Sequence, residues 1–358
     1  MENKCLPSVK IGNFQLASLF IMTRMFSDCL NFPVMVSKYG MQRLSVMLIS
    51  YVVIFALYIP AIILSRRFEG ESVFSLFATK CRPLFYIVAP LFILLMLFQS
   101  VLTGASLEFF VSNTLMNTIS HILAILLLTV VAVYGVAKGL SALVRIAPLL
   151  LTLFVTAVVL GIISSFGNMY FYYLYPSFVD TPATFWDEVR LELSKNAELF
   201  AFLVLCRFSV KKAQRAVYMY LPGVLLLSLL MFTVCLVLLG PGLNMVSFPY
   251  NRAAMVTDLV VLERLDGLDM FIWIIAAVLK IVMFMSVVRN VIVLVFKERA
   301  AKMSAAALTV ISGGLSYFVA ANRHFLMSVD LSWAIIAAML VFGVVCPIIA
   351  MFLSRVES

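Results

Sequence analysis

Long apolar stretches recur along the chain and are separated by short polar segments. A helix needs about 20 mostly apolar residues to cross a bilayer. Backbone polar groups must also be paired inside lipid, and the alternating pattern of barrel strands is absent. The sequence therefore predicts an all-α polytopic protein with ten transmembrane helices. They are expected near residues 14–36, 43–65, 83–109, 119–137, 141–166, 196–208, 216–239, 268–296, 303–321 and 331–353.

Two of the ten predicted spans are irregular, and they are the first and the sixth. The first is crowded with polar residues before Pro33, and the sixth has an unbroken apolar run only from Leu199 to Cys206. Because five is an odd number, the second group of five helices enters the membrane from the face opposite to the first group. This arrangement is typical of an inverted repeat, in which the first helix of each repeat is interrupted. We expect one integral membrane domain over residues 1–358, with repeats at about 11–166 and 196–353.

The composition supports membrane insertion and changes how the charge is interpreted. The chain is 64% hydrophobic and 12% charged, with a mean hydropathy of +1.11, whereas soluble domains are roughly 45–50% apolar and about 25% charged. The net charge of +9 is explained by basic cytoplasmic loops, since Lys and Arg resist translocation. Nucleic acid is therefore not an expected partner.

The distribution of basic residues predicts the orientation. With the N-terminus inside, fifteen Lys and Arg residues face the cytoplasm and seven face outward. We therefore expect both termini to be cytoplasmic. The segment 167–195 is predicted to lie outside, as an interfacial stretch rich in tyrosine with a short helix capped at Thr181 or Thr184.

The motifs of enzymes and cofactor proteins are not found. The six cysteines are scattered, the two histidines lie far apart, and no phosphate loop, dinucleotide fingerprint or zinc-protease motif is present. We expect no catalysis, no metal and no cofactor.

Several stretches resemble a known family. The segments are NFQLASLFIMTRMFSDCLNFP (13–33), GLSALVRIAP (139–148), NAELFAFLV (196–204) and LERLDGLDMFIWIIAAVLK (262–280). The chain resembles the GerAB-type permease subunit, or B-subunit, of bacterial spore germinant receptors, within the amino acid–polyamine–organocation transporter superfamily. The resemblance implies a LeuT-like 5+5 fold in the spore inner membrane. It also implies partner subunits of A-type and C-type (lipoprotein), and a small nutrient ligand such as an amino acid.

The resemblance also implies where the ligand binds. Family ligand sites lie between the interrupted first and sixth helices and the third and eighth. By position these are Thr23 to Asp28, Thr103, and Asn196 to Phe202. The family's first helix usually breaks at a glycine-rich centre, whereas this chain has Phe26, Ser27 and Asp28 there. The cradle for an α-carboxylate is therefore altered, and the ligand need not be a simple zwitterionic amino acid.

Charged residues inside apolar spans require a partner, because a charge at the bilayer centre costs about 2.5–3.5 kcal/mol on insertion scales. Arg24 and Asp28 are four residues apart on one helix face, so they form either a structural ion pair or a ligand-facing pair. Glu198 is placed to suit a helix dipole or a ligand. Lys280 is predicted to be partnered or ligand-facing. The candidate ligand-binding residues are Thr23, Arg24, Ser27, Asp28, Gln99, Thr103, Asn196, Glu198, Phe202 and Lys280.

Three functions remain open at the level of sequence. The first is a receptor subunit that binds a nutrient and signals to partner subunits. The second is a stand-alone secondary transporter of amino acids or amines. The third is a membrane scaffold whose pocket is vestigial, an interpretation that the missing glycines make conceivable.

Overall fold

The computed structural model describes residues 10–30, 40–114, 121–174, 182–210, 212–246, 248–255, 266–322 and 330–355. Every regular element in these ranges is helical, and the only extended pairing is a bridge between Ile11 and Ser209. The prediction of an all-α fold is confirmed. The longer helices are α1 (Asn13–Leu30), α2 (Gly40–Arg67), α4 (Arg82–Thr114), α5 (His121–Lys138), α6 (Leu140–Ser165), α9 (Gln214–Leu239), α11 (Asp266–Ile292) and α12 (Glu298–Ala321).

Shorter elements complete the described chain. They are α3 (Val73–Lys80), η1 (Phe166–Asn168), η2 (Phe171–Leu174), α7 (Pro182–Ser194), α8 (Glu198–Leu205), η3 (Cys206–Phe208), η4 (Gly240–Met245), α10 (Pro249–Met255), α14 (Ser332–Ala338), the π-helical η5 (Met339–Val345) and α15 (Cys346–Arg355). The last three follow one another without a gap and together make one long helix.

Within the described residues, eight helical stretches are long and apolar enough to cross a membrane. They correspond to the predicted spans other than the first and the sixth. Those two, α1 and α8, are the spans that the sequence predicts to be irregular. The structure thus confirms a polytopic membrane protein and shows eight spans of ordinary length where ten were predicted.

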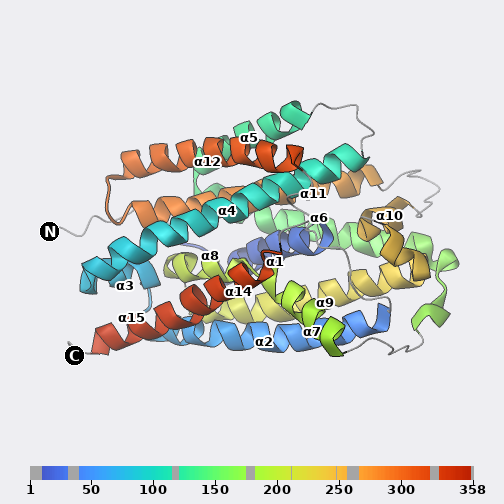
Figure 1. Ribbon diagram of the computed structural model, residues 1–358, viewed down its shortest axis with the longest axis horizontal. Coiled ribbons are helices and arrows are strands. Elements are labelled where there is room, and N and C mark those ends of the chain that lie inside the picture. The colour runs from blue at the N-terminus through green and yellow to red at the C-terminus, as the bar shows by residue number, and fades with distance from the viewer. Residues whose placement is uncertain are drawn as a thin grey trace.

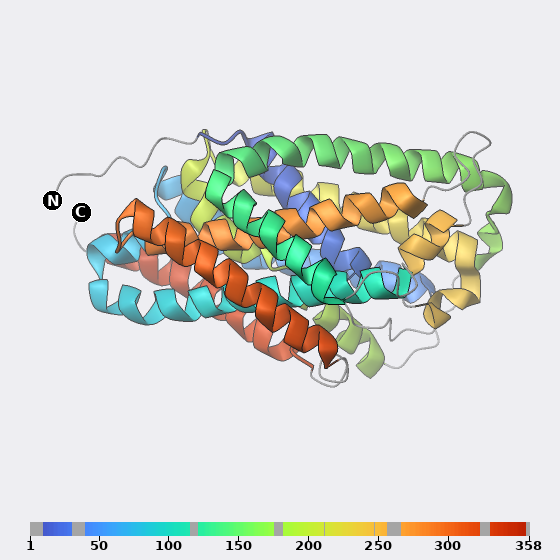
Figure 2. The same cartoon turned by 90° about the horizontal axis from the view of Figure 1, so that it is seen from above.

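The helices form two groups along the long axis of the molecule (Figure 1). One group consists of α4, α5, α11 and α12, which pack against one another, with α5 and α12 lying obliquely over α4 and α11 (Figure 2). The other group contains α1, α2 and α9, with α7 packed on α2. Within the second group, helix α1 packs on α9, and it also contacts α11 of the first group. It therefore lies at the junction of the two groups.

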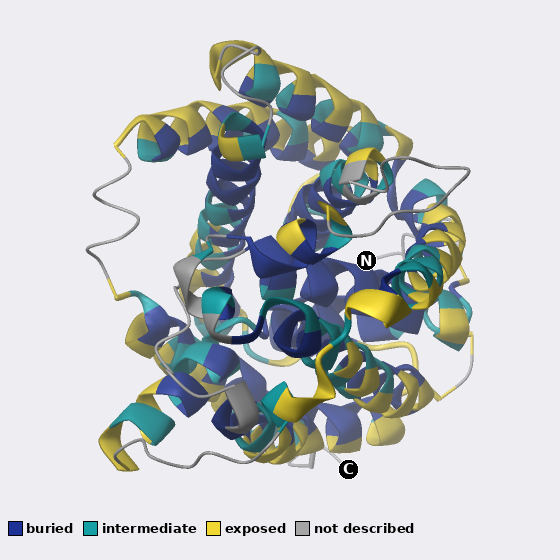
Figure 3. Cartoon of the chain, turned by 90° about the vertical axis from the view of Figure 1, so that its right-hand side faces the viewer, coloured by how far each residue is buried: buried dark blue, intermediate teal, exposed yellow. Residues whose placement is uncertain are grey.

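The outward surface of the helices is apolar. In the end-on view the buried residues lie between the helices and the exposed ones face outward (Figure 3). Leu149 is 73% exposed and Phe318 is 66% exposed. Such side chains are unfavourable in water but suit contact with lipid tails, which supports a membrane location.

Helix α1 is unbroken, contrary to the interruption predicted at its centre. It is helical from Asn13 to Leu30, so Phe26 to Asp28 lie inside a regular helix. No glycine or proline occurs between these ends, and buried side chains surround the helix on nearly all sides. Packing therefore holds the helix straight through its polar stretch. The predicted irregular positions Asn31 and Pro33 lie outside the described residues.

The sixth predicted span is short, as its apolar run indicated. Helix α8 has only eight residues and ends in the 3-10 turn η3. It is preceded by α7, which the sequence placed in an interfacial segment. The placement at the membrane interface stays a prediction, and the structure shows that α7 has two different faces: Trp186 is 60% exposed, whereas Glu188, Val189 and Glu192 are buried. The hydrophobicity of α7 is low because its inner face carries carboxylates instead of apolar groups.

The predicted cap of this helix is corrected in one respect. Helix α7 begins at Pro182, which suits the first helical position because proline lacks an N–H. Thr184 lies inside the helix and cannot be its cap, and Thr181 lies outside the described residues.

The π-helical segment η5 allows α8 to approach closely. Gly343 lies in η5, and a Cβ atom there would come within 2.6 Å of Leu199 Cδ2. A larger residue at position 343 would require Leu199 to move, and Leu199 is fully buried at the start of α8. The site-bearing helix is thereby fixed against the last span.

Candidate functional site

A buried lysine joins α11 to α1 and α8. Lys280 lies in the middle of α11 and is 2% exposed. Its Nζ donates to Thr23 O at 3.1 Å, to Glu198 Oε1 at 3.3 Å, and to the Ser27 hydroxyl. The Glu198 side chain is fully buried. The prediction that Lys280 has a partner is confirmed, and so is the prediction that Glu198 begins its helix.

A second network of charges is centred on Glu192. Its Oε1 lies 2.5 Å from Arg24 Nη2 and its Oε2 lies 2.5 Å from Arg43 Nη2. Lys195 Nζ lies 3.2 Å from the same Oε2. Burial alone would raise the pKa of Glu192, but Lys195, Arg43 and Arg24 together hold it well below its usual range. Glu192 therefore stays ionised and holds α1, α2 and α7 together.

Asp28 connects this network to α9. Arg24 Nη1 lies 3.2 Å from Asp28 Oδ1, which confirms the predicted ion pair between residues four apart. The Asp28 side chain is 2% exposed, and its Oδ2 accepts a hydrogen bond from Ser228 at 2.7 Å. Lys195 Nζ is 3.8 Å from Asp28 Oδ1. Arg24, Arg43 and Lys195 thus face Asp28 and Glu192, and a third buried carboxylate, Glu188, lies one turn before Glu192 on α7.

An aromatic box adjoins the charges. Phe202 of α8 contacts Phe20 and Tyr58, with ring centroids 6.5 Å and 5.9 Å apart. Tyr220 of α9 lies 5.7 Å from Phe20 and 6.1 Å from Tyr58. The Tyr220 hydroxyl donates to Asn196 Oδ1 at 2.8 Å. Four helices, α1, α2, α8 and α9, therefore meet around these rings.

Three buried polar atoms in the same region have no hydrogen-bond partner among the described residues. They are Asn196 Nδ2, Glu198 Oε2 and the Tyr58 hydroxyl oxygen. The Tyr58 side chain is close enough to Glu198, Tyr220 and Asn196 to interact with all three. A buried donor or acceptor without a partner costs about 1–3 kcal/mol, so such a cluster is typical of a place that a polar ligand or ordered water fills.

Two predicted site residues, Thr103 and Gln99, are not joined to this centre by a hydrogen bond or ion pair among the described residues. The Thr103 hydroxyl donates to Gln99 O at 2.7 Å, within α4. Gln99 Nε2 is buried and has no hydrogen-bond partner among the described residues. No hydrogen bond or ion pair in the described part of the chain joins either side chain to Lys280, Glu198 or Arg24. Their assignment to a ligand stays a prediction, while the other eight candidates share one buried region.

The chain matches the model of a known protein family over residues 10–323, and the family is described as spore germination protein, or spore permease. The chain belongs to this spore germination protein family. The match covers most of the sequence and includes all ten candidate residues. No curated protein matches the chain.

In this spore germination protein, several residues at the centre of the candidate site were not among the candidates predicted from the sequence. They are charged or aromatic. Glu192, Lys195 and Arg43 were assigned to outside segments, and their burial depends on α7 packing against α2. Tyr58 and Tyr220 are hydroxyl-bearing residues inside apolar spans. A hydroxyl at that depth needs a partner, and this signal could have identified both.

The described residues contain no group of three or more His, Cys, Asp or Glu side chains that could hold a metal ion. The assembled chemistry is thus ammonium, guanidinium, carboxylate, amide and phenol groups. This set can bind a small polar molecule or exchange a proton.

Proposed function

We propose that this spore germination protein is the permease-like subunit of a germinant receptor in the spore inner membrane. It binds a small nutrient, an amino acid or a related compound, in a midplane pocket and signals germination with A-type and C-type (lipoprotein) subunits. Family membership supports the role in germination. The observation that carries ligand binding is the cluster of partnerless polar atoms on Asn196, Glu198 and Tyr58.

The charges around the pocket suit a ligand with two polar ends. The three cations of the Glu192 network, Arg24, Arg43 and Lys195, favour an anionic group near Lys195, whose side chain is 10% exposed. Glu198 Oε2 accepts a hydrogen bond from an ammonium or hydroxyl group at the other end. The aromatic box of Phe20, Phe202, Tyr58 and Tyr220 offers an apolar surface beside which the rest of the ligand packs.

Signalling is a shift between two arrangements of the helices. A ligand changes the population only if it binds one arrangement more tightly than the other. Because the pocket groups come from α1, α2, α8 and α9, contacts to a ligand favour the arrangement that brings these helices together. Partner subunits respond to that arrangement.

We further propose that ten crossings form a LeuT-like inverted repeat with both termini in the cytoplasm. Equivalent helices of the two halves lie against each other: α4 packs with α11, α5 with α12 and α2 with α9, and α1 contacts α8. The start of α1 also lies beside the end of α8, where Ile11 N donates to Phe208 O at 2.8 Å. In this topology α8 completes the sixth crossing together with its flanking turns.

A secondary transporter on the same fold is the second candidate. It is favoured by the ion pair of Lys280 and Glu198, since a buried ammonium and carboxylate can exchange a proton as their surroundings change. Uptake of a labelled amino acid or amine into liposomes by the isolated protein, driven by a proton gradient, would support this candidate. Uptake by a subunit that also requires its partners for germination would support both activities.

The decisive experiment removes one partnerless hydroxyl. Tyr58→Phe removes only the hydroxyl and keeps the ring that packs on Phe202 and Tyr220, so the aromatic box is preserved. If a ligand uses the hydroxyl, the nutrient concentration for half-maximal germination rises by about 2- to 12-fold, the equivalent of about 0.5–1.5 kcal/mol. Tyr86→Phe, on the exposed face of α4, is the matched control.

Ligand binding at the Tyr58 hydroxyl requires a specific result for each of the two variants. Tyr58→Phe must keep normal accumulation and thermal stability while the germination threshold rises, and Tyr86→Phe must change neither. An unchanged threshold in Tyr58→Phe, together with an unchanged threshold in Glu198→Gln, would show that ligand does not bind here.

A further inference from the structure

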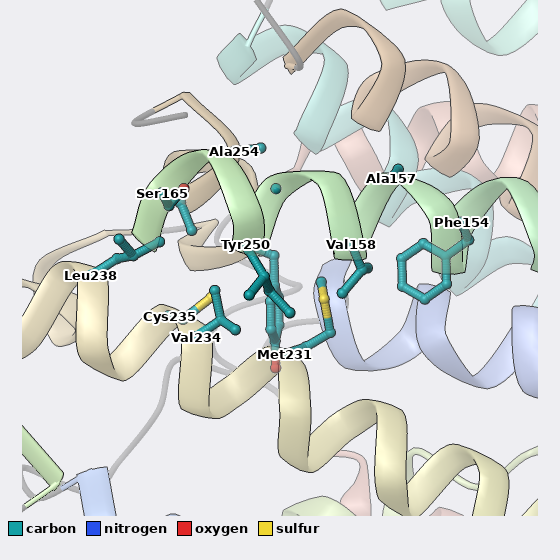
Figure 4. Close-up of a pocket in the computed structure, with 13 residues that line it drawn as sticks. Phe154, Ala157, Val158, Ser165, Met231, Val234, Cys235, Leu238, Tyr250 and Ala254 are labelled. Atoms are coloured by element: carbon teal, nitrogen blue, oxygen red, sulfur yellow. The ribbon is translucent and has the colours of Figure 1, made fainter. Parts of the chain in front are cut away.

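A pocket of about 580 Å³, counted with its open mouth, lies between α6, α9 and α10. Side chains from α6 and α9 face each other across it, and Tyr250 of α10 closes it from behind (Figure 4). Nearly all of its lining is apolar, including Phe154, Val158 and Met231. Its lining shares no residue with the charged centre described above.

The mouth of the pocket borders the lipid-facing surface. On α6 the half-buried lining residue Val158 is followed directly by Val159, which is 44% exposed. Farther along the same helix, half-buried Ile162 is followed by Ile163, which is 65% exposed. The pocket therefore runs along the edge between two spans, beside the hydrocarbon of the bilayer.

The length of the pocket matches one leaflet. Its lining on α6 extends from Phe154 to Ser165, which at 1.5 Å per residue is about 16 Å. Half of a hydrocarbon core of about 30 Å is about 15 Å. Ser165 is the last residue of α6, and the exposed aromatic residues Phe166, Tyr170 and Tyr172 follow it. Aromatic side chains of this kind mark the membrane interface.

The outer end of the pocket has one unused polar group. Ser165 is fully buried, and its hydroxyl has no hydrogen-bond partner among the described residues. A hydroxyl at the membrane interface can donate to the ester carbonyl of a phospholipid, which lies at that depth. A long apolar space with one donor at the interface is thus complementary to an acyl chain attached through its ester.

We propose that this pocket binds one acyl chain of a bilayer phospholipid, with its ester carbonyl accepting a hydrogen bond from Ser165. The chain enters sideways between α6 and α9 and extends inward to Phe154. Burial of the chain is coupled to the charged centre, because Ser228, which holds Asp28, lies one turn from Met231 on α9. Lipid composition therefore influences the arrangement in which α1 and α9 are held.

Fluorescence quenching by brominated lipid tests the proposal. Trp273 is 1% exposed and packs on Phe154, with ring centroids 5.3 Å apart, so it reports on the inner end of the pocket. The full-length protein carrying Trp186→Phe and Trp333→Phe retains Trp273 as its only tryptophan. It is reconstituted into vesicles of phosphatidylcholine with or without bromine on the acyl chains, in the absence of detergent.

We expect brominated chains to quench Trp273 although the surrounding bilayer cannot touch it. Ala157→Phe fills the pocket and abolishes the quenching. If Ala157→Phe does not accumulate, Gly161→Val is used as the pocket-filling variant in its place. Val159→Phe, on the adjacent lipid face, leaves the quenching unchanged. Absence of quenching, or equal quenching after the pocket is filled, would overturn the proposal.

Discussion

At the scale of residues, Arg24 shows how one side chain holds several elements together. It is fully buried and contacts both Asp28 and Glu192, so it joins its own helix to α7. The prediction from sequence contained only the pair within α1. The second partner, Glu192, lies 168 positions away in the chain. A mutation of the Arg24–Asp28 pair therefore also changes the contact of α1 with α7.

Exchanging the two charges should therefore fail to restore the protein. In the double variant Arg24→Asp with Asp28→Arg, the new carboxylate at position 24 faces Glu192, which keeps Arg43 and Lys195 but loses Arg24 as a partner. A buried pair broken in this way costs about 3–5 kcal/mol, so we expect low accumulation and a lowered melting temperature in detergent. Normal stability of the exchanged protein would mean that the link to Glu192 is unimportant.

Removing one charge of the Lys280–Glu198 pair should affect stability differently from removing both charges. Lys280→Met leaves Glu198 buried without its cation and should lose about 3–5 kcal/mol of stability. Adding Glu198→Gln removes the remaining charge, so thermal stability should return while the germination response does not. If the double variant responds to nutrient with normal sensitivity, the pair is structural only.

At the scale of elements, close helix packing depends on which face a glycine occupies. Gly313 of α12 faces α5, and a Cβ atom there would lie 2.2 Å from Thr129 Oγ1. Gly314 is its neighbour in sequence but is exposed, and a Cβ atom there would meet nothing within 4 Å. The same pattern of small residues therefore contains one essential and one replaceable position.

These two glycines form a matched pair for mutation. Gly313→Ala should destabilise the packing of α12 on α5 by about 1–3 kcal/mol, because the added methyl group overlaps Thr129. Gly314→Ala should be neutral or stabilising by up to about 1 kcal/mol, since alanine favours helix more than glycine does. Melting temperatures of the purified variants measure both effects, and equal values would contradict the packing of this interface.

At the scale of the whole molecule, orientation in the membrane can be tested with two exposed positions. Trp186 lies on the outer face of α7 and Lys302 near the start of α12, and both are exposed. In a cysteine-free background, Trp186→Cys should react with an impermeant maleimide from outside, and Lys302→Cys should react only after the membrane is permeabilised. Reversed labelling would place both termini outside and would remove the inverted-repeat proposal.

Much of this organisation follows from local sequence. Eight spans are recognisable from apolar runs, because the bilayer imposes one length on every crossing helix. The partner of Lys280 could be expected without being named, since a buried charge must be compensated. The short α8 follows from the brief apolar run beginning at Leu199, and the Arg24–Asp28 pair follows from helical spacing alone.

Tertiary structure decided the rest. The sequence assigned Glu192 and Arg43 to outside segments because charged residues in polar stretches normally face water, but packing of α7 on α2 buries them together. Helix α1 stays regular through Phe26 to Asp28 because partners from other helices satisfy its polar groups. Contacts between residues far apart in the chain depend on how helices pack, and the local pattern of a helix does not contain that information.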